Sequence, residues 1–186
     1  AARDEDFIEY VHQANMHSTM MFFTEQGRLY WTKVYELPEG NRQSKGRALQ
    51  NMINIQKGDK VCAFIHVKNL SDQEYVQNHY LIFATKNGLM KKTTLESYSR
   101  PRTNGIIALG LREDDRLIRV TLTDGKSQML VASYNGKVVR FPEDTVRPMG
   151  RTATGVRAIK LDEDGRDRVI GMICVEEGSK DSVLVI

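Results

Sequence analysis

Cysteine is scarce in this sequence, and long hydrophobic runs are missing. The two cysteines, Cys62 and Cys174, each lie inside an apolar run, which is typical of reduced thiols in a cytoplasmic protein rather than of a disulfide framework. No apolar run approaches the roughly 20 residues that span a bilayer, and the opening Ala-Ala-Arg-Asp-Glu-Asp lacks the apolar stretch of a signal peptide. These absences argue against membrane-spanning and secreted classes.

Net charge is also small, because 27 Lys and Arg residues oppose 24 Asp and Glu residues to give +3. That value alone implies no partner. The hydrophobic fraction of 40% over 186 residues is too high for an intrinsically disordered chain. A chain of this length buries roughly 70% of its unfolded surface, enough for a core without metal or disulfide staples. The composition therefore indicates an ordinary globular protein of one large domain or two small ones.

Catalytic and metal-binding patterns are absent as well. Residues 40–46, Gly-Asn-Arg-Gln-Ser-Lys-Gly, superficially resemble a phosphate-binding loop, but Lys and Gly are in the wrong order and no Ser or Thr follows. The four histidines show no paired-ligand spacing. The acidic turns at residues 4–6, 113–115 and 162–164 lack the alternating ligands of a calcium loop, so we expect them to shape turns. We therefore expect no enzyme activity, metal or cofactor in these residues.

An internal repeat is the strongest pattern in the sequence. Three apolar runs end in related tetrapeptides whose glycines are Gly27, Gly88 and Gly136, so the unit recurs every 48 to 61 residues. Each of these glycines is followed by a basic segment, an Arg-rich loop and a second glycine, at Gly46, Gly105 or Gly155. Apolar segments and an acidic turn come next. A repeat of this length is typical of solenoids, propellers and related arrays.

Local signals within each unit favour strands, because short apolar runs are bounded by Asn-Gly or Asp-Gly pairs that suit tight hairpin turns. About four strands per repeat predict an all-β, propeller-like array in which each blade covers the next. A β-sandwich is the competing architecture, but it does not explain the repeat. We expect repeats at about 4–57, 58–113 and 114–164, with part of a fourth at 165–186. The pattern starts and stops within a unit, so we expect a piece of a longer array.

Positive charge is concentrated at the same place in every repeat. The basic segments, residues 27–47, 86–105 and 136–157, hold 15 Lys and Arg against five Asp and Glu. Equivalent positions of successive blades lie side by side, so we expect a continuous positive band along one rim, as in proteins that bind a nucleic-acid backbone. The plainer interpretation is that these cations are solvated or pair with neighbouring acidic turns.

Duplex DNA is the nucleic acid that fits the band better. The aromatic residues near these cations, Trp31, Tyr35 and Tyr98, do not recur as a platform for stacking single-stranded bases, and we expect them in the blade cores. Arginine suits bidentate contacts to phosphate. Binding of this kind is largely independent of sequence and is weakened steeply by salt.

Three segments of the sequence resemble one known family. Residues 24–47, with Thr24-Glu25-Gln26-Gly27 and Arg42-Gln43-Ser44-Lys45-Gly46-Arg47, are similar to the first blade of the C-terminal domain of the DNA gyrase A subunit. Residues 87–105 resemble its second blade and residues 136–157 its third, the third match being the most specific. The corresponding chain of topoisomerase IV has a related domain and is the nearest alternative relative.

The resemblance implies a β-pinwheel, a propeller relative in which blades exchange a strand, with about three complete four-stranded blades and part of a fourth. It also implies that the basic outer rim binds, bends and wraps duplex DNA and so supports ATP-dependent negative supercoiling by the whole gyrase. The implied DNA-binding residues are Arg28, Lys33, Arg42, Lys45, Arg47, Lys91, Lys92, Arg100, Arg102, Lys137, Arg140, Arg147, Arg151 and Arg157.

The same resemblance implies partners outside this chain: the rest of the gyrase A subunit, together with the gyrase B subunit, in a bacterial, cytoplasmic and nucleoid-associated holoenzyme with two copies of each. ATP and Mg are expected on other domains or subunits. The family's basic box, Gln-Arg-Arg-Gly-Gly-Lys-Gly, is expected just before Ala1. Two other functions compete with DNA wrapping: a protein-interaction propeller that binds an acidic partner, and an enzyme with a site in the central channel.

Overall fold

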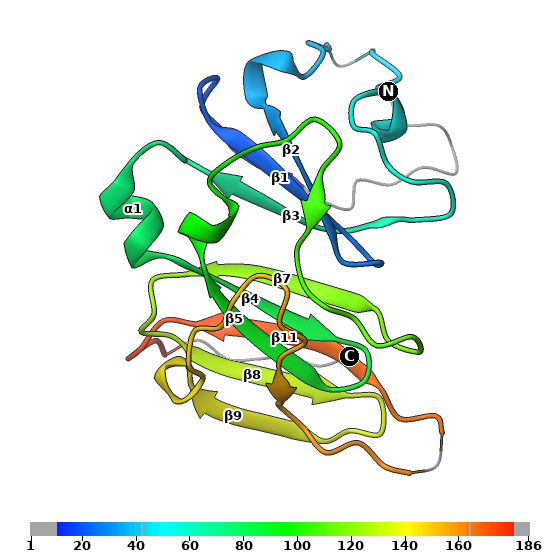
Figure 1. The fold of residues 1–186 in the computed structure, drawn as a ribbon, viewed down its shortest axis with the longest axis vertical. Helices are drawn as coiled ribbons and strands as arrows, with labels where there is room; N and C mark the ends of the chain where they lie inside the picture. The colour runs from blue at the N-terminus through cyan, green and yellow to red at the C-terminus, as the bar shows by residue number, and fades with distance from the viewer. Residues whose placement is uncertain (1–10, 42, 164, 181–186) are drawn as a thin grey trace.

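A computed structural model describes residues 11–41, 43–163 and 165–180. They form three antiparallel β-sheets that follow one another along the long axis of the molecule (Figure 1). One short α-helix, α1 (Gln73–Asn78), projects at the side of the array. The strands are β1 (Thr19–Thr24), β2 (Arg28–Lys33), β3 (Val61–Val67), β4 (Tyr80–Thr85), β5 (Leu89–Thr94), β6 (Ile106–Ile107), β7 (Leu117–Thr123), β8 (Gln128–Ser133), β9 (Val138–Pro142), β10 (Val156–Arg157) and β11 (Val169–Val175).

Consecutive sheets exchange a strand. The first sheet has the order β3-β1-β2-β6 and the second the order β10-β5-β4-β7, so each takes its outermost strand from the following repeat. In register, Leu29 of β2 faces Ile106 of β6, and Met90 of β5 faces Val156 of β10. The exchange confirms the all-β pinwheel architecture expected from the resemblance.

The third sheet has the order β11-β8-β9 and holds three strands within the described part of the chain. The partial fourth repeat was expected to end in residues 181–186, which lie outside the described residues. Strand β3 belongs to the first sheet although its residues fall in the expected second repeat of 58–113. Sequence repeats and structural blades therefore divide the chain at different points.

The recurring tetrapeptides form the hairpin turns that join β1 to β2, β4 to β5 and β8 to β9. In the first turn the Gly27 amide donates to the Thr24 carbonyl at 2.9 Å, and the Arg28 amide donates to Thr24 Oγ1 at 3.1 Å. The second turn repeats both bonds at Thr85. Gly27 has a φ of 79° and Gly88 one of 87°, values that favour glycine. The motif is thus a turn signal.

Acidic residues fasten these hairpin turns, and one of them, Asp115, belongs to an acidic turn expected from the sequence. The carboxylate of Asp59 accepts from the Gln26 amide at 3.2 Å, and that of Asp115 accepts from the Asn87 amide at 2.9 Å. In the third blade Asp167 takes the equivalent place, at 3.1 Å from the Asn135 amide. The turn expected at residues 4–6 lies outside the described residues.

Two hydrophobic clusters join the blades to one another. The first lies between the first and second sheets, where Phe23 and Phe83 pack edge to face with ring centroids 5.5 Å apart. The second lies between the second and third sheets, around Ile82 and Met129. Strands β1 and β4 are buried along nearly their whole length, because both faces of each strand are covered. This explains their uninterrupted apolar sequences. No helix in the described part of the chain is long and apolar enough to span a membrane.

Candidate nucleic-acid interface

The cations of the basic segments do not share one environment. Eight of the predicted DNA-binding residues are exposed, on loops, in the β8–β9 turn or on the outer strands β9 and β10: Lys45, Arg47, Arg100, Arg102, Lys137, Arg140, Arg147 and Arg157. Arg42 lies outside the described residues. The other five are partly or fully buried and contact the protein itself. The candidate interface is therefore a subset of the predicted one.

The first and second repeats meet at an open hollow of about 1120 Å³ whose lining includes Lys33, Arg47 and Arg102. These three cations come from the end of β2, from the long loop after it and from the Arg-rich loop of the second repeat. The ammonium of Lys33 also donates to Thr19 Oγ1 at 3.0 Å. Glu36 and Glu39 share the lining, so the hollow is basic but not uniformly so.

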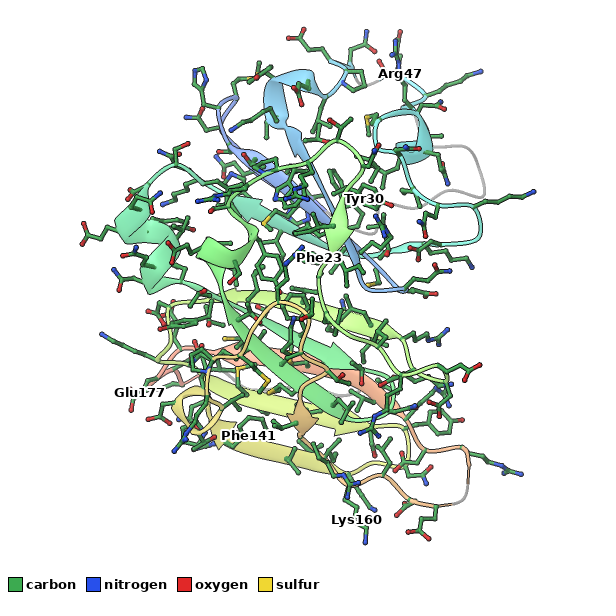
Figure 2. All side chains as sticks on the ribbon, in the orientation of Figure 1. Phe23, Tyr30, Arg47, Phe141, Lys160 and Glu177 are labelled. Carbon is green, nitrogen blue, oxygen red and sulfur yellow. The ribbon has the colours of Figure 1, made fainter. Side chains whose placement is uncertain are left out.

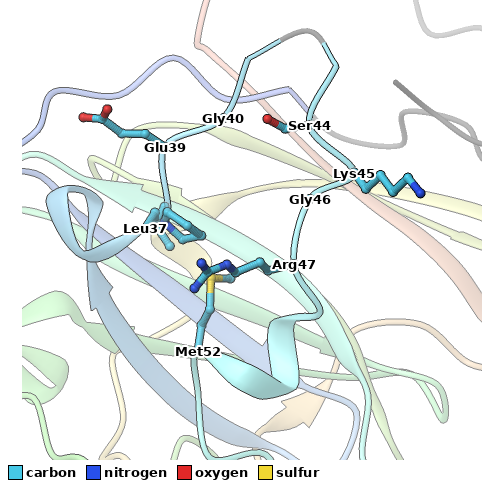
Figure 3. Close-up of a pocket in the computed structure, with 9 residues that line it drawn as sticks. Leu37, Glu39, Gly40, Ser44, Lys45, Gly46, Arg47 and Met52 are labelled. Atoms are coloured by element: carbon cyan, nitrogen blue, oxygen red, sulfur yellow. The ribbon is translucent and has the colours of Figure 1, made fainter.

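A smaller hollow of about 450 Å³ lies within the long loop of the first repeat, between Leu37 and Met52 (Figure 3). Arg47 points into it beside Met52, whereas Lys45 points away toward solvent. Figure 2 places Arg47 at one end of the molecule and Lys160 at the other. Between Lys45 and Arg47, which share this loop, Lys45 is therefore the better placed to contact a bulky polyanion.

The second and third repeats meet at a hollow of about 570 Å³ whose lining includes Lys126 and Arg147 together with Asp124 and Asp144. Lys126 follows the turn Asp124-Gly125 between β7 and β8 and is exposed. The sequence reasoning missed it because it lies outside the basic segments. Its position directly after an Asp-Gly turn at the end of a strand was the available signal.

Three further predicted residues are engaged by the protein. The guanidinium of Arg28 donates to the Asn104 carbonyl at 3.0 Å and to the Tyr30 hydroxyl at 3.2 Å. Lys137 forms an ion pair with Asp162, and this contact, followed by the hydrogen bond from Asn135, holds the pKa of Asp162 below its usual value. The Arg151 guanidinium donates to the Ile107 carbonyl at 3.4 Å. Pairing with an acidic turn, the plainer interpretation of these charges, thus applies to Lys137.

Lys91 was expected on the rim, and its complete burial contradicts this. Its ammonium donates to the Tyr98 hydroxyl at 3.2 Å, to the Ala108 carbonyl at 2.6 Å and to the Arg151 carbonyl. It also lies 4.8 Å from the centroid of the Phe83 ring. Burial, and secondly the charge of Arg151, lowers the pKa of Lys91 to about 7. The lysine was misplaced because the segments that cover it are distant in sequence.

Lys92 was also expected on the rim and is buried instead. Its ammonium lies 3.3 Å from Glu143 Oε1 and 4.4 Å from the centroid of the Tyr80 ring. Glu143 accepts further hydrogen bonds from the Thr123 hydroxyl and, at 3.2 Å, from the Ser127 amide. Lys92 therefore connects the second and third blades through a buried ion pair and is not exposed on the rim.

A hollow of about 350 Å³ lies between β3, β7 and β11, each an edge strand of its sheet. Its lining includes Glu25, Cys62 and Arg119. Burial, then the negative charges of Glu25 and Asp59, raises the pKa of the Cys62 thiol to about 12. A thiol of this kind is a poor nucleophile. Within residues 11–41, 43–163 and 165–180, no three His, Cys, Asp or Glu side chains cluster as metal ligands do. This hollow gives no support to the central-channel enzyme.

DNA gyrase A subunits are among the relatives in sequence. The chain is 46% identical over 171 residues to the DNA gyrase A subunit of Salmonella typhimurium, covering 92% of this chain and 19% of that one. It is 42% identical over 183 residues to the DNA gyrase A subunit of Staphylococcus aureus, covering 98% of this chain and 20% of the relative. The chain thus spans about a fifth of the length of these curated relatives.

Solved structures of similar fold include domains of DNA topoisomerase IV and DNA gyrase. The C-terminal domain of DNA topoisomerase IV matches with a TM-score of 0.76 at 27% identity, over 87% of this chain and 48% of that one. A DNA gyrase A C-terminal domain shares the fold with a TM-score of 0.69 at 21% identity, over 88% and 50%. Residues 18–68, 79–124 and 128–176 match the family described as "DNA gyrase C-terminal domain, beta-propeller". Each matched range contains one of the three hairpin turns, and the chain belongs to this family.

Proposed function

We propose that the chain binds duplex DNA without sequence specificity along its exposed cations, and bends or wraps it, as part of a DNA gyrase A subunit. The observation that carries the proposal is the recurrence of cations where consecutive repeats meet. Lys33, Arg47 and Arg102 line the first hollow, and Lys126 and Arg147 line the second. A curved array with cations at equivalent junctions offers repeated contacts to a polyanion.

Phosphate contacts account for such binding without base recognition. Lysine and arginine that neutralise phosphates release condensed counterions, so the affinity falls steeply with salt. Proteins that bend DNA in this way use backbone contacts rather than base contacts. In the proposed complex the fixed angle between consecutive blades sets the direction of the bound duplex.

Negative supercoiling is the activity of the whole enzyme in this proposal. The gyrase relatives extend far beyond this chain, which covers about 19% of one of them. The proposed partners are the remainder of the gyrase A subunit, together with the gyrase B subunit, in the bacterial cytoplasm. ATP and Mg belong to those parts of the enzyme. The proposed role of these 186 residues is to position DNA.

Gyrase is preferred to topoisomerase IV as the parent enzyme. Gyrase A subunits are 42 to 46% identical to this chain over nearly its whole length. Among the solved structures, the topoisomerase IV domain is 27% identical and the gyrase A domain 21%, so the preference rests on the sequence relatives. A basic box immediately upstream of residue 1 in the parent protein would support gyrase. A parent protein without that box would favour topoisomerase IV.

A charge-reversal experiment tests the proposal. The variant Arg102→Glu, Arg140→Glu, Arg147→Glu changes three exposed cations of the basic segments. Its control, Lys57→Glu, Lys68→Glu, Lys160→Glu, changes three exposed cations outside them. Fluorescence anisotropy with duplexes of different sequence should show weaker binding by the first variant only. The slope of log affinity against log salt should flatten by about 0.9 for each phosphate that is no longer neutralised.

A competition separates the proposal from its rival. An acidic polypeptide competitor distinguishes DNA binding from a protein-interaction role for the same cations. The proposal requires that duplex displace the polypeptide and that the reverse displacement be weak. Equal binding by the two triple variants, or tighter binding of the polypeptide than of duplex, contradicts it.

A further inference from the structure

The Arg147 loop, defined as residues 146–155, belongs to the third repeat but lies against the second blade. Its Met149 amide donates to the Lys92 carbonyl at 2.8 Å, and its Ala153 carbonyl accepts from the Gly110 amide at 3.2 Å. A Cβ on Gly155 would stand 2.4 Å from the Met90 carbonyl oxygen, so this end of the loop touches the β5 backbone. The loop that carries Arg147 is thus seated on a neighbouring blade.

The ammonium of Lys91 lies where the Arg147 loop contacts the second blade. An ammonium has three donors and no acceptor, and here it faces three oxygens: the Tyr98 hydroxyl and the carbonyls of Ala108 and Arg151. These oxygens lie on the turn after β5, on the segment after β6 and on the Arg147 loop. One side chain therefore ties three segments from two repeats together.

The first blade holds its equivalent loop without a buried lysine. Tyr30 holds the position in β2 that Lys91 holds in β5, since both are the third residue after the hairpin glycine. The Tyr30 ring packs beneath Gly105, whose Cβ would stand 2.7 Å from a ring atom. The loop there is held by Arg28, through the Asn104 carbonyl at 3.0 Å. A buried lysine is therefore not required by the strand exchange itself.

We propose that Lys91 is a positioning residue for DNA binding, which fixes the Arg147 loop on the second blade so that Arg147 faces the same duplex as the second blade's own exposed cations. This inference rests on the proposed function. Lys91 acts through the Arg151 main chain and touches no phosphate. Fully satisfied buried polar networks select one arrangement over its competitors, even where they add little stability.

The salt dependence of duplex affinity distinguishes a positioning role for Lys91 from a direct contact between Lys91 and a phosphate. Lys91→Met keeps an unbranched side chain as far as the Cε position and removes the ammonium with its three donors. If Arg147 leaves the duplex, the slope of log affinity against log salt falls by about 0.9. In an Arg147→Gln background Lys91→Met should then cause no further fall, whereas a direct phosphate contact by Lys91 predicts a further fall of about 0.9 there. The control Lys160→Met removes one exposed positive charge outside the basic segments and leaves the slope unchanged. An unchanged slope for Lys91→Met alone, or a further fall of about 0.9 in the Arg147→Gln background, overturns the proposal.

Hydrogen exchange in the absence of DNA tests whether Lys91 holds the Arg147 loop on the second blade. In the full 186-residue chain, Lys91→Met should lose amide protection in residues 146–155 and 106–110 while β4 and β7 keep theirs. Unchanged protection in both segments overturns the proposal. A wild-type chain with no salt-dependent duplex binding defeats the proposed function, and with it the DNA role of Lys91.

A second substitution keeps the test usable if Lys91→Met fails to fold. Tyr98→Phe removes one acceptor of the ammonium and the hydroxyl that donates to the Ala108 carbonyl at 2.7 Å, with no change of charge. It should lower the protection of residues 146–155 and 106–110 and flatten the salt slope as well. Protection and slope equal to those of the wild type overturn the proposal.

Discussion

The Lys92 ammonium of β5 lies 3.3 Å from the Glu143 carboxylate in the turn after β9, and both side chains are buried. Two blades are thus joined by an ion pair inside the protein. Removal of one partner from a buried pair leaves an uncompensated charge and costs about 3 to 5 kcal/mol. This pair and the donors of Thr123 and Ser127 form one network.

We expect Lys92→Met to lower the free energy of unfolding by about 3 to 5 kcal/mol, because Glu143 remains buried without its cation. The double variant Lys92→Met, Glu143→Met should be less destabilised than the sum of the two single variants. Urea denaturation of all four proteins gives this coupling directly. Lys137→Met, which removes a solvent-exposed ion pair with Asp162, is the control and should leave stability nearly unchanged. Additive single-variant effects would contradict the network.

The burial of Lys91 predicts a dependence of stability on pH. The pKa of this lysine is lowered from 10.5 to about 7. Between these two values the unfolded chain binds more protons than the folded one, so the free energy of unfolding rises with pH through this window. Below about pH 7 the ammonium is present in both states and the destabilisation is complete.

Lys91→Met should lack this rise, so the difference in stability between variant and wild type should change steadily from pH 7 to pH 10, in favour of the wild type. Denaturant midpoints at several pH values measure it, with Lys160→Met as the control for a general charge effect. The groups that face the Lys91 ammonium are Tyr98, Arg151 and the carbonyl of Ala108. Burial raises the pKa of Tyr98 above its ordinary value, so Tyr98 stays protonated in this window. A parallel pH profile for the two proteins would contradict the assignment.

The strands, the hairpin turns and the positions of the basic loops could be predicted from the sequence, because Thr24, Gly27 and their counterparts form local bonds within a few residues. The burial of Lys91 could not. Its cover comes from Arg151, 60 residues later, and from the strand exchange around it. A count of charges treats every lysine as exposed, and nothing local to Lys91 or Lys92 marks them as core residues.

The short helix and one cation were also missed. Helix α1 spans six residues and begins where the Asp72 carboxylate accepts from the Tyr75 amide at 3.1 Å. A single turn and a half shows no helical periodicity in sequence. Lys126 lies outside the basic segments, and only the fold brings it into the same hollow as Arg147. The helix is thus too short to show a periodicity, and the place of Lys126 depends on a contact between distant segments.

We expect Lys126→Gln to weaken duplex binding about as much as Arg147→Gln, because both line the second junction hollow. Each variant should flatten the salt dependence of log affinity by about 0.9 if it no longer neutralises one phosphate. Lys68→Gln, an exposed lysine outside both hollows, is the matched control. Isothermal titration with a mixed-sequence duplex at several salt concentrations measures all three. Equal slopes for Lys126→Gln and Lys68→Gln would remove Lys126 from the interface.

Substitutions at three glycines separate two constraints on the backbone: a positive φ and a lack of space for a Cβ. Gly155 has a φ of 104° and its Cβ would stand 2.4 Å from the Met90 carbonyl oxygen, so Gly155→Ala suffers both conformational strain and a backbone clash. Gly136 has a φ of 85° but open space around it, so Gly136→Ala suffers strain alone, about 1 to 2 kcal/mol. Gly150 has neither constraint, and Gly150→Ala should change stability by less than about 0.5 kcal/mol. Thermal denaturation should rank the losses in that order, and Gly155→Ala should also release β10 from β5 in hydrogen exchange. Equal losses for Gly155→Ala and Gly136→Ala would show that the close approach to Met90 contributes nothing to the exchange.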